Sequence, residues 1–201
     1  MREIFLQHNN LDEIIAEAVK VLAAGGVIVY PTETAYGLGA DYFSDVAVAK
    51  VYAIKQRAEN KFLTAIVSDL AMAEKLVIFD DQARQLAAKY WPGALTMVLP
   101  CRFYGQKKYF PETLGLRISS NTFCQKLTRI SQMPLVSTSA NISGREALYS
   151  VDHIKEQFAH LDIQPDLLIN AGNLPLTPPS TIIKIEAGAV EVLRQGKIII
   201  N

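Results

Sequence analysis

The fold of this chain depends on the stretch Tyr30-Pro-Thr-Glu-Thr-Ala-Tyr-Gly-Leu-Gly-Ala-Asp41, where an apolar run leads into polar groups and two closely spaced glycines. The run before it, Val27-Ile-Val-Tyr30, is short and β-branched and therefore predicts a buried strand. The polar side chains that follow are those of Thr32, Glu33 and Thr34. We expect the next helix to begin near Ser44. Open α/β sheets bind ligands where strands end, so the stretch predicts either such a site or an ordinary strand-to-helix connection.

The length and composition predict one globular domain. The chain has 201 residues, of which 50% are hydrophobic and 20% are charged, and this excludes a wholly disordered protein. We expect a single domain over residues 1–201. Lys plus Arg equal Asp plus Glu, so the formal net charge is zero. A polycation that coats nucleic acid is excluded, and any anion site must be local.

Neither a membrane span nor a cysteine-based site is expected. The longest nearly apolar stretch, Val21 to Pro31, is too short to cross a bilayer, and the first residues lack an apolar signal core. We therefore predict a cytoplasmic protein without a membrane partner. Cys101 and Cys124 are isolated thiols, and the three histidines are scattered. A disulfide framework or a Cys/His zinc site is not expected.

Helices and strands alternate along most of the chain. The expected helices lie at 11–22, 44–57, from Ser68, 80–90, from Ser120 or Asn121 to 130, and 151–161. The expected strands lie at 27–30, 64–67, 94–99, 114–119, 135–138, 167–170, 181–186, 189–194 and 197–200. The alternation predicts an α/β fold, and the run of strands at the end predicts a mixed sheet.

Two groups of cations interrupt this pattern. Lys55, Arg57 and Lys61 gather where a helix ends, either because cations favour that end of the helix dipole or because they hold a polyphosphate. Arg117 lies inside the apolar strand 114–118, where its charge needs a partner. That partner is either a bound carboxylate or phosphate or a structural salt bridge.

Hydroxyl groups collect in the run Ser137-Thr-Ser-Ala-Asn-Ile-Ser-Gly144, which fits either a turn with a helix cap or a site that orients an amino acid or nucleotide. The run is not a G-x-S-x-G elbow, and histidines are scarce, so a serine hydrolase is not expected. Ser180 and Arg194 lie in further loop-like positions. A P-loop is absent, and Gly37-x-Gly39 lacks the third glycine of a Rossmann motif.

Seven short motifs occur together in one order. They are Pro31-Thr-Glu-Thr-x-Tyr-Gly-Leu-Gly39, Lys55-x-Arg57, Trp91-Pro-Gly-x-Leu-Thr96, Gly115-Leu-Arg117, Ser137-Thr-Ser-Ala-Asn-x-Ser-Gly144, Ser180-Thr-Ile-Ile183 and Leu193-Arg-x-Gly196. Together they resemble the YrdC-like family, the threonylcarbamoyl-AMP synthases, in its short bacterial form. The resemblance implies a single domain with a twisted, open, mixed sheet flanked by helices.

The resemblance also implies a reaction. The family joins L-threonine, bicarbonate and ATP into threonylcarbamoyl-adenylate and pyrophosphate, a nucleotidyl transfer in which Mg²⁺ accompanies ATP and no protein metal site is expected. A separate transferase complex then modifies adenosine 37 of tRNAs that read codons beginning with A. By position, the threonine site would comprise Thr34, Arg117, Ser139 and Ser180. The ATP site would comprise Arg57, Lys61, Thr113, Asn141 and Arg194.

Catalysis in such a site would rest on positioning and charge neutralisation, because every reacting species is anionic. Lys55 and Arg57 would supply the charge near the phosphates, and no general base is named. Thr32 and Glu33 would shape the turn, while Gly37 and Gly39 would let the backbone approach the substrates. The chain departs from the family pattern at Ala58, Ile66, Tyr149 and the pair Ile118-Ser119.

Two other functions fit the same residues. A double-stranded RNA or tRNA-binding module would use the loop at 102–110, which carries Arg102, Lys107 and Lys108 among aromatic residues. A paralogue would keep the nucleotide site without the threonine reaction, as the changes at Ala58 and Tyr149 allow.

Overall fold

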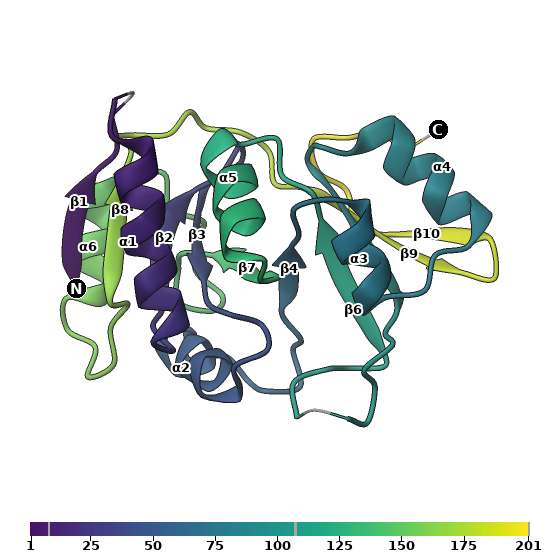
Figure 1. Ribbon diagram of the computed structural model, residues 1–201, viewed down its shortest axis with the longest axis horizontal. Coiled ribbons are helices and arrows are strands. Elements are labelled where there is room, and N and C mark those ends of the chain that lie inside the picture. The colour runs from purple at the N-terminus through teal and green to yellow at the C-terminus, as the bar shows by residue number, and fades with distance from the viewer. Residues whose placement is uncertain (8, 107, 201) are drawn as a thin grey trace.

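One continuous mixed sheet forms the centre of the molecule (Figure 1). The structure, a computed structural model, describes residues 1–7, 9–106 and 108–200, which contain ten strands and six helices. The strand order is β1-β8-β2-β3-β7-β4-β6-β5-β9-β10. Four neighbouring pairs are parallel and five are antiparallel. The predicted α/β class with a mixed, open sheet is confirmed.

The strands are β1 (Arg2–Phe5), β2 (Ile28–Pro31), β3 (Tyr36–Gly39), β4 (Thr64–Ile66), β5 (Leu95–Pro100), β6 (Thr113–Arg117), β7 (Leu135–Ser139), β8 (Leu167–Asn170), β9 (Thr181–Glu186) and β10 (Ala189–Arg194). The helices are α1 (Leu11–Ala23), α2 (Asp45–Lys55), α3 (Leu70–Leu76), α4 (Asp81–Tyr90), α5 (Thr122–Ser131) and α6 (Val151–Phe158). Within the described residues, no helix is both long and apolar enough to cross a membrane.

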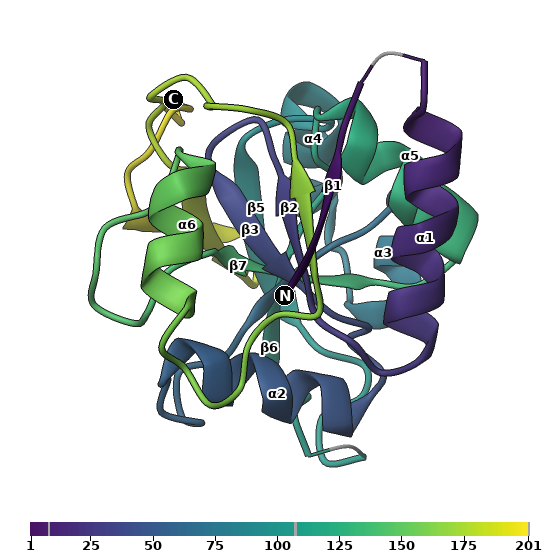
Figure 2. The same ribbon diagram turned by 90° about the vertical axis from the view of Figure 1, so that its left-hand side faces the viewer.

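Strand β2 is buried on both faces, which explains its continuous apolar sequence. Ile28 and Tyr30 pack into the cluster beneath α1 and α5, whereas Val29 points to the larger cluster that includes residues of α2 and α6. Figure 2 shows α1 and α5 together on one side of the strands and α6 on the other. The predicted strand at 27–30 is therefore the centre of a two-sided core.

Most predicted helix starts are confirmed by side-chain caps. Ser44 accepts a hydrogen bond from the Ala47 amide, and Asn121 accepts two from the first turn of α5. Asp80 caps α4 in the same way. The expected cap at Ser68 is wrong by one residue, because Asp69 accepts the Met72 amide at 2.8 Å.

The stretch from Tyr30 to Asp41 contains a strand that the sequence did not predict. Tyr36–Gly39 forms β3, paired antiparallel with β2 on one side and β7 on the other. A Cβ atom on Gly39 would lie 2.7 Å from the Tyr30 ring and 3.0 Å from Leu135. Gly39 was expected to let the backbone approach a substrate. Instead it makes room for the core side chains of Tyr30 and Leu135. Gly37 does line the cavity described below.

Gly39→Ala is expected to lower the free energy of unfolding by about 1–3 kcal/mol, because the Tyr30 ring is fully buried and cannot move aside cheaply. Chemical denaturation measures the change. Gly37→Ala is the matched comparison and should cost less, since its Cβ would lie 3.1 Å from the same ring. Equal midpoints for the wild type and Gly39→Ala would contradict the packing argument.

The two ends of the chain differ from expectation. β1 was not predicted, and it pairs with β8, which lies more than 160 residues later in the sequence. Residues 197–200 were expected to form a strand and do not. Instead Ile198 and Ile200 pack against the core, and the hydroxyl of Thr181 bonds the main chain at Gly196 and Ile198.

Candidate functional site

A cavity of about 270 Å³ is lined by the part of the sheet that runs from β3 to the edge strand β10. Seven adjacent strands, from β3 to β10 in the strand order, each contribute at least one lining residue. In that order, one from each strand, they are Gly37, Ser137, Thr64, Arg117, Thr96, Ile182 and Arg194. Gly115 lies between Thr64 and Thr96, and a Cβ there would be 2.7 Å from the Thr64 methyl group. Gly115 therefore keeps space between Thr64 and Thr96 on the floor of the cavity.

The turn between β2 and β3 supplies the first wall. Thr32 is 6% exposed, and its hydroxyl accepts the Thr34 and Ala35 amides while donating to the Ala35 carbonyl at 2.7 Å. This confirms that Thr32 shapes the turn. The turn places the hydroxyl of Thr34 at the cavity, 3.0 Å from that of Thr32.

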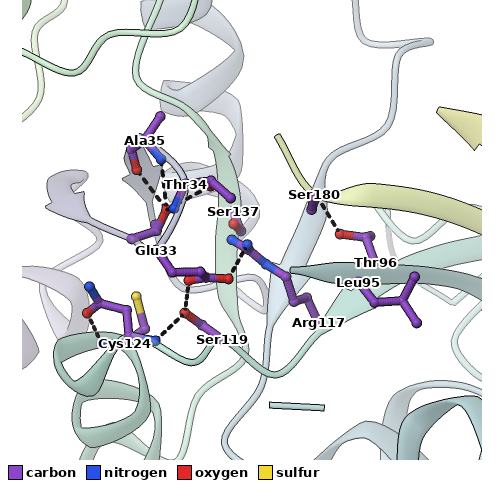
Figure 3. Close-up of polar contacts among 12 residues, drawn as sticks. Glu33, Thr34, Ala35, Leu95, Thr96, Arg117, Ser119, Cys124, Ser137 and Ser180 are labelled. Carbon is purple, nitrogen blue, oxygen red and sulfur yellow. Dashed lines mark hydrogen bonds and ion pairs between the residues drawn. The ribbon is translucent and has the colours of Figure 1, made fainter. Parts of the chain in front are cut away.

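Glu33 does more than shape the turn, which differs from the expectation. Its carboxylate accepts a hydrogen bond from Nη1 of Arg117 at 2.5 Å and another from the Ser119 hydroxyl (Figure 3). The two charged side chains are 13% and 7% exposed. Arg117 therefore has the internal salt bridge that its buried position required, and it also lines the cavity.

A second group of polar contacts surrounds Ser180. Its hydroxyl lies 3.1 Å from that of Thr96 and accepts a hydrogen bond from Nη2 of Arg194 at 3.0 Å. Arg194 also donates to the Ser180 carbonyl. Burial, followed by the positive charge of Arg117, lowers the pKa of Arg194 from its ordinary value.

Arg57 follows α2 and clamps the next turn. Its Nε donates to the Lys61 carbonyl at 2.8 Å, and its Nη2 donates to the Phe62 carbonyl at 3.0 Å. Arg57, Arg117 and Arg194 all line the cavity, whereas no Asp or Glu is among the described lining residues. The cavity therefore favours anionic ligands.

Lys55 lies behind the cavity and is 1% exposed. Its Nζ donates to the carbonyls of Ser139 and Asn141, at 2.6 and 2.8 Å, and approaches Oδ1 of Asn141 at 3.4 Å. Burial, aided by the charge of Arg57, lowers the pKa of Lys55 to about 7, while the three oxygen atoms favour the protonated form. Lys55 thus fastens the segment after β7 to the end of α2.

The structure brings most of the predicted site residues together. Those that line the cavity are Thr34, Arg57, Arg117, Ser139, Ser180 and Arg194. Lys55 and Asn141 support the wall from behind, whereas Lys61 and Thr113 are not among the lining residues. The unpredicted lining residues include Phe62, Thr64 and Thr96. The sequence did contain a sign of two of them, because Thr64 and Thr96 are hydroxyl residues within otherwise apolar strands.

The loop proposed for RNA binding buries two of its four aromatic rings, whereas Tyr104 is 63% exposed and Phe103 is partly buried. Tyr109 and Phe110 are 5% and 3% exposed, and Phe110 contacts the rings of Tyr42 and Phe103. Arg102 donates to the carbonyls of Glu74 and Val77. Lys108 pairs with Glu59, and Lys107 lies outside the described residues. Base stacking on Tyr109 or Phe110 is therefore excluded in this conformation.

Both cysteines are buried and free. Burial raises the pKa of the Cys124 thiol to about 12, and the thiol donates to the Pro31 carbonyl. Cys101 also has a raised pKa, again chiefly because of burial. The expectation that neither cysteine is part of a disulfide framework agrees with these positions.

Curated proteins similar to this chain share a name. A protein of Methanocaldococcus jannaschii, provisionally named a threonylcarbamoyl-AMP synthase, is 35% identical over 179 residues, which cover 89% of this chain and 84% of that protein. The threonylcarbamoyl-AMP synthase of Bacillus subtilis is 30% identical over 191 residues, covering 93% of this chain and 54% of that protein.

Solved structures similar to this fold carry related names. P. abyssi Sua5 complexed with L-threonine has a TM-score of 0.84 at 27% identity, covering 97% of this chain and 57% of that one. E. coli YciO has a TM-score of 0.82 at 29% identity, covering 97% and 94%. The chain thus spans about half the length of the Bacillus and P. abyssi proteins. The family model Sua5/YciO/YrdC, described as "Telomere recombination", matches residues 20–196. On this match and on the shared fold, the chain belongs to the Sua5/YciO/YrdC family.

Proposed function

We propose that the protein forms threonylcarbamoyl-AMP and pyrophosphate from L-threonine, bicarbonate and ATP, as a nucleotidyltransferase. The observation that carries the proposal is the cavity itself, which combines three arginines with a hydroxyl-rich floor. All three substrates carry negative charge, and threonine adds a hydroxyl and an amine. A cavity with this lining suits them together, and the relatives at 30–35% identity bear the name of this activity.

The buried floor suits threonine. Arg117 provides planar N–H donors for its carboxylate, and Arg is the side chain that matches a carboxylate at two points. Thr34, Ser139 and Ser180 provide hydroxyls around it, and Thr96 holds the Ser180 hydroxyl in place. The ammonium of threonine would first lose a proton, and the amine would then form a carbamate, either by attack on carbon dioxide with release of a second proton or by attack on bicarbonate with loss of water. An oxygen of the carbamate would attack the α-phosphorus of ATP, and pyrophosphate would leave as the phosphoanhydride bond breaks.

The rim of the cavity suits ATP. The rim consists of lining residues that are partly or fully exposed: the cations Arg57 and Arg194, and the side chains of Phe62, Tyr149 and Ile182. This combination of cations and apolar surface fits phosphates beside a base. Tyr149 is fixed by a hydrogen bond from its hydroxyl to the Thr177 carbonyl. Mg²⁺ would accompany the phosphates of ATP, which are its usual ligands in nucleotide sites.

Pyrophosphate release tests the proposal. We expect release that requires L-threonine and bicarbonate together with ATP. ATP binding without threonine-dependent release would favour a paralogue that keeps only the nucleotide site. Salt-sensitive binding of RNA without release would favour an RNA-binding module. Transfer of the product to tRNA by a separate complex, with or without direct tRNA contact by this chain, is a further part of the proposal.

Arg57→Ala is expected to raise the KM for ATP about 10- to 30-fold, because it removes one cation at the rim and loosens the turn that Arg57 clamps. Steady-state pyrophosphate release measures it. Arg102→Ala is the matched control, since Arg102 also donates to two main-chain carbonyls but does not line the cavity. Similar KM values in the two variants would contradict a role for Arg57 in ATP binding.

A further inference from the structure

The contact between Glu33 and Arg117 joins two distant segments of the chain. Glu33 lies on the turn between β2 and β3, and Arg117 ends β6. Both oxygens of the Glu33 carboxylate are occupied, one by Arg117 and the other by the Ser119 hydroxyl. Glu33 is not among the residues that line the cavity, whereas Thr32, Thr34 and Ala35 are. Its carboxylate therefore lies behind the cavity wall and touches the cavity only through Arg117.

Arg117 has donors to spare. A guanidinium group carries five N–H donors, and within the described part of the chain Arg117 uses one of its nitrogens, Nη1, for a hydrogen bond. Arg117 lines the cavity, so a ligand there can reach its side chain. Figure 3 shows the carboxylate of Glu33 on one side of this group and Ser137 and Ser180 beyond it.

The carboxylate is itself held firmly. The Ser119 hydroxyl that donates to Glu33 also accepts the amide of Asn121, which caps α5. On the same helix, Cys124 donates to the carbonyl of Pro31, two residues before Glu33. The start of α5 therefore fixes both the carboxylate and the turn that carries it. A guanidinium bound to such an anchor has few orientations available.

We propose that Glu33 is a positioning residue for the amino-acid substrate, which fixes the Arg117 guanidinium with its free donors toward the cavity. This inference rests on the proposed function, because it takes the ligand of those donors to be the carboxylate of L-threonine. Glu33 does not touch the substrate. It acts by keeping Arg117 in the one orientation that binds a carboxylate from the cavity side.

Two substitutions separate positioning from mere support of the fold. Glu33→Ala removes both acceptors, so Arg117 loses its partner and its orientation. Glu33→Gln removes the charge but keeps an oxygen acceptor for Nη1 and a polar group beside Ser119. Both leave a cation at 7% exposure without its counter-charge, and both should lower the thermal midpoint. Only the loss of orientation should weaken threonine binding.

The experiment measures pyrophosphate release against the concentration of each substrate, with calorimetric binding of L-threonine as a readout independent of turnover. We expect Glu33→Ala to raise the KM for threonine about tenfold or more and leave the KM for ATP unchanged, while Glu33→Gln stays within about threefold of the wild type. Glu17→Ala is the control, since Glu17 pairs with Arg2 and Lys20 away from the cavity and should change neither KM.

Three results would overturn the inference. An unchanged KM for threonine in Glu33→Ala, with a lowered thermal midpoint, would make the contact a structural salt bridge alone. Equal impairment in Glu33→Ala and Glu33→Gln would assign the effect to charge and not to orientation. A wild-type protein that neither releases pyrophosphate with threonine nor binds threonine would remove the proposed function and this inference together. Threonine binding without release would remove the proposed reaction only, and the calorimetric comparison of the variants would still decide the role of Glu33.

Discussion

Arg117→Ala is expected to lower kcat/KM for L-threonine by about 100-fold or more, because it removes the buried cation on the cavity floor. A carboxylate that leaves water for this floor needs a counter-charge, and Arg117 is the most buried of the three arginines that line the cavity. Pyrophosphate release at varied threonine and saturating ATP measures the loss. The KM for ATP should change far less, since Arg57 and Arg194 remain.

The stability of the variant needs its own measurement. Removing Arg117 leaves the carboxylate of Glu33 buried without a counter-charge, and this is expected to lower the free energy of unfolding by about 3 kcal/mol. Arg117→Lys keeps the charge but loses the planar set of donors, so it should retain more stability and still lose about tenfold in kcat/KM. Arg2→Ala, which breaks an exposed pair with Glu17, should change neither quantity appreciably. Full threonine-dependent activity in folded Arg117→Ala would exclude Arg117 from the substrate site.

The parts of the fold that could be predicted are those with local causes. The strand at 27–30 and the helices capped by Ser44, Asp80 and Asn121 follow from hydrophobic pattern and cap chemistry, which a few neighbouring residues decide. β3 could not be predicted in this way. Its sequence, Tyr36-Gly-Leu-Gly39, is poor in strand-forming residues, and it becomes a strand because β2 and β7 flank it on both sides.

The candidate site shows the same division. Six of the residues predicted from motif positions line one cavity: five lie on or beside strands of the sheet, and Arg57 follows α2. The sequence indicated that Arg117 needs a partner, but it did not indicate that Glu33, 84 residues away, is that partner. Nor did it indicate that the ammonium of Lys55 points behind the wall, because that direction depends on the loop packed over the end of α2.

Lys55→Met is the second variant with a large expected effect. Methionine fills a similar volume but donates no hydrogen bond, so the carbonyls of Ser139 and Asn141 lose their shared donor. Asn141 also holds the next turn, through donation to the carbonyls of Ile142 and Arg145. Displacement of this segment moves Ser139 at the cavity, and we expect kcat/KM to fall by about 100-fold. The substitution displaces part of the cavity wall and does not remove a contact to ATP, so raising the concentration of ATP should not restore the rate.

The free energy of unfolding, measured against pH, shows whether Lys55 is protonated when it holds the cavity wall. The pKa of Lys55 is about 7 in the folded chain and about 10.4 in an unfolded one, so between these values the unfolded chain binds one proton more. The free energy of unfolding of the wild type should therefore rise with pH in that window, by at most about 1.4 kcal/mol per pH unit, and the titration of Lys55 should add no pH dependence below pH 7. Lys55→Met lacks the amino group, so the difference in free energy of unfolding between the wild type and the variant isolates the titration of Lys55. A difference that stays constant from pH 7 to 10 would mean that the three oxygen atoms keep Lys55 protonated, and the ammonium would then fasten the wall at every pH in the range.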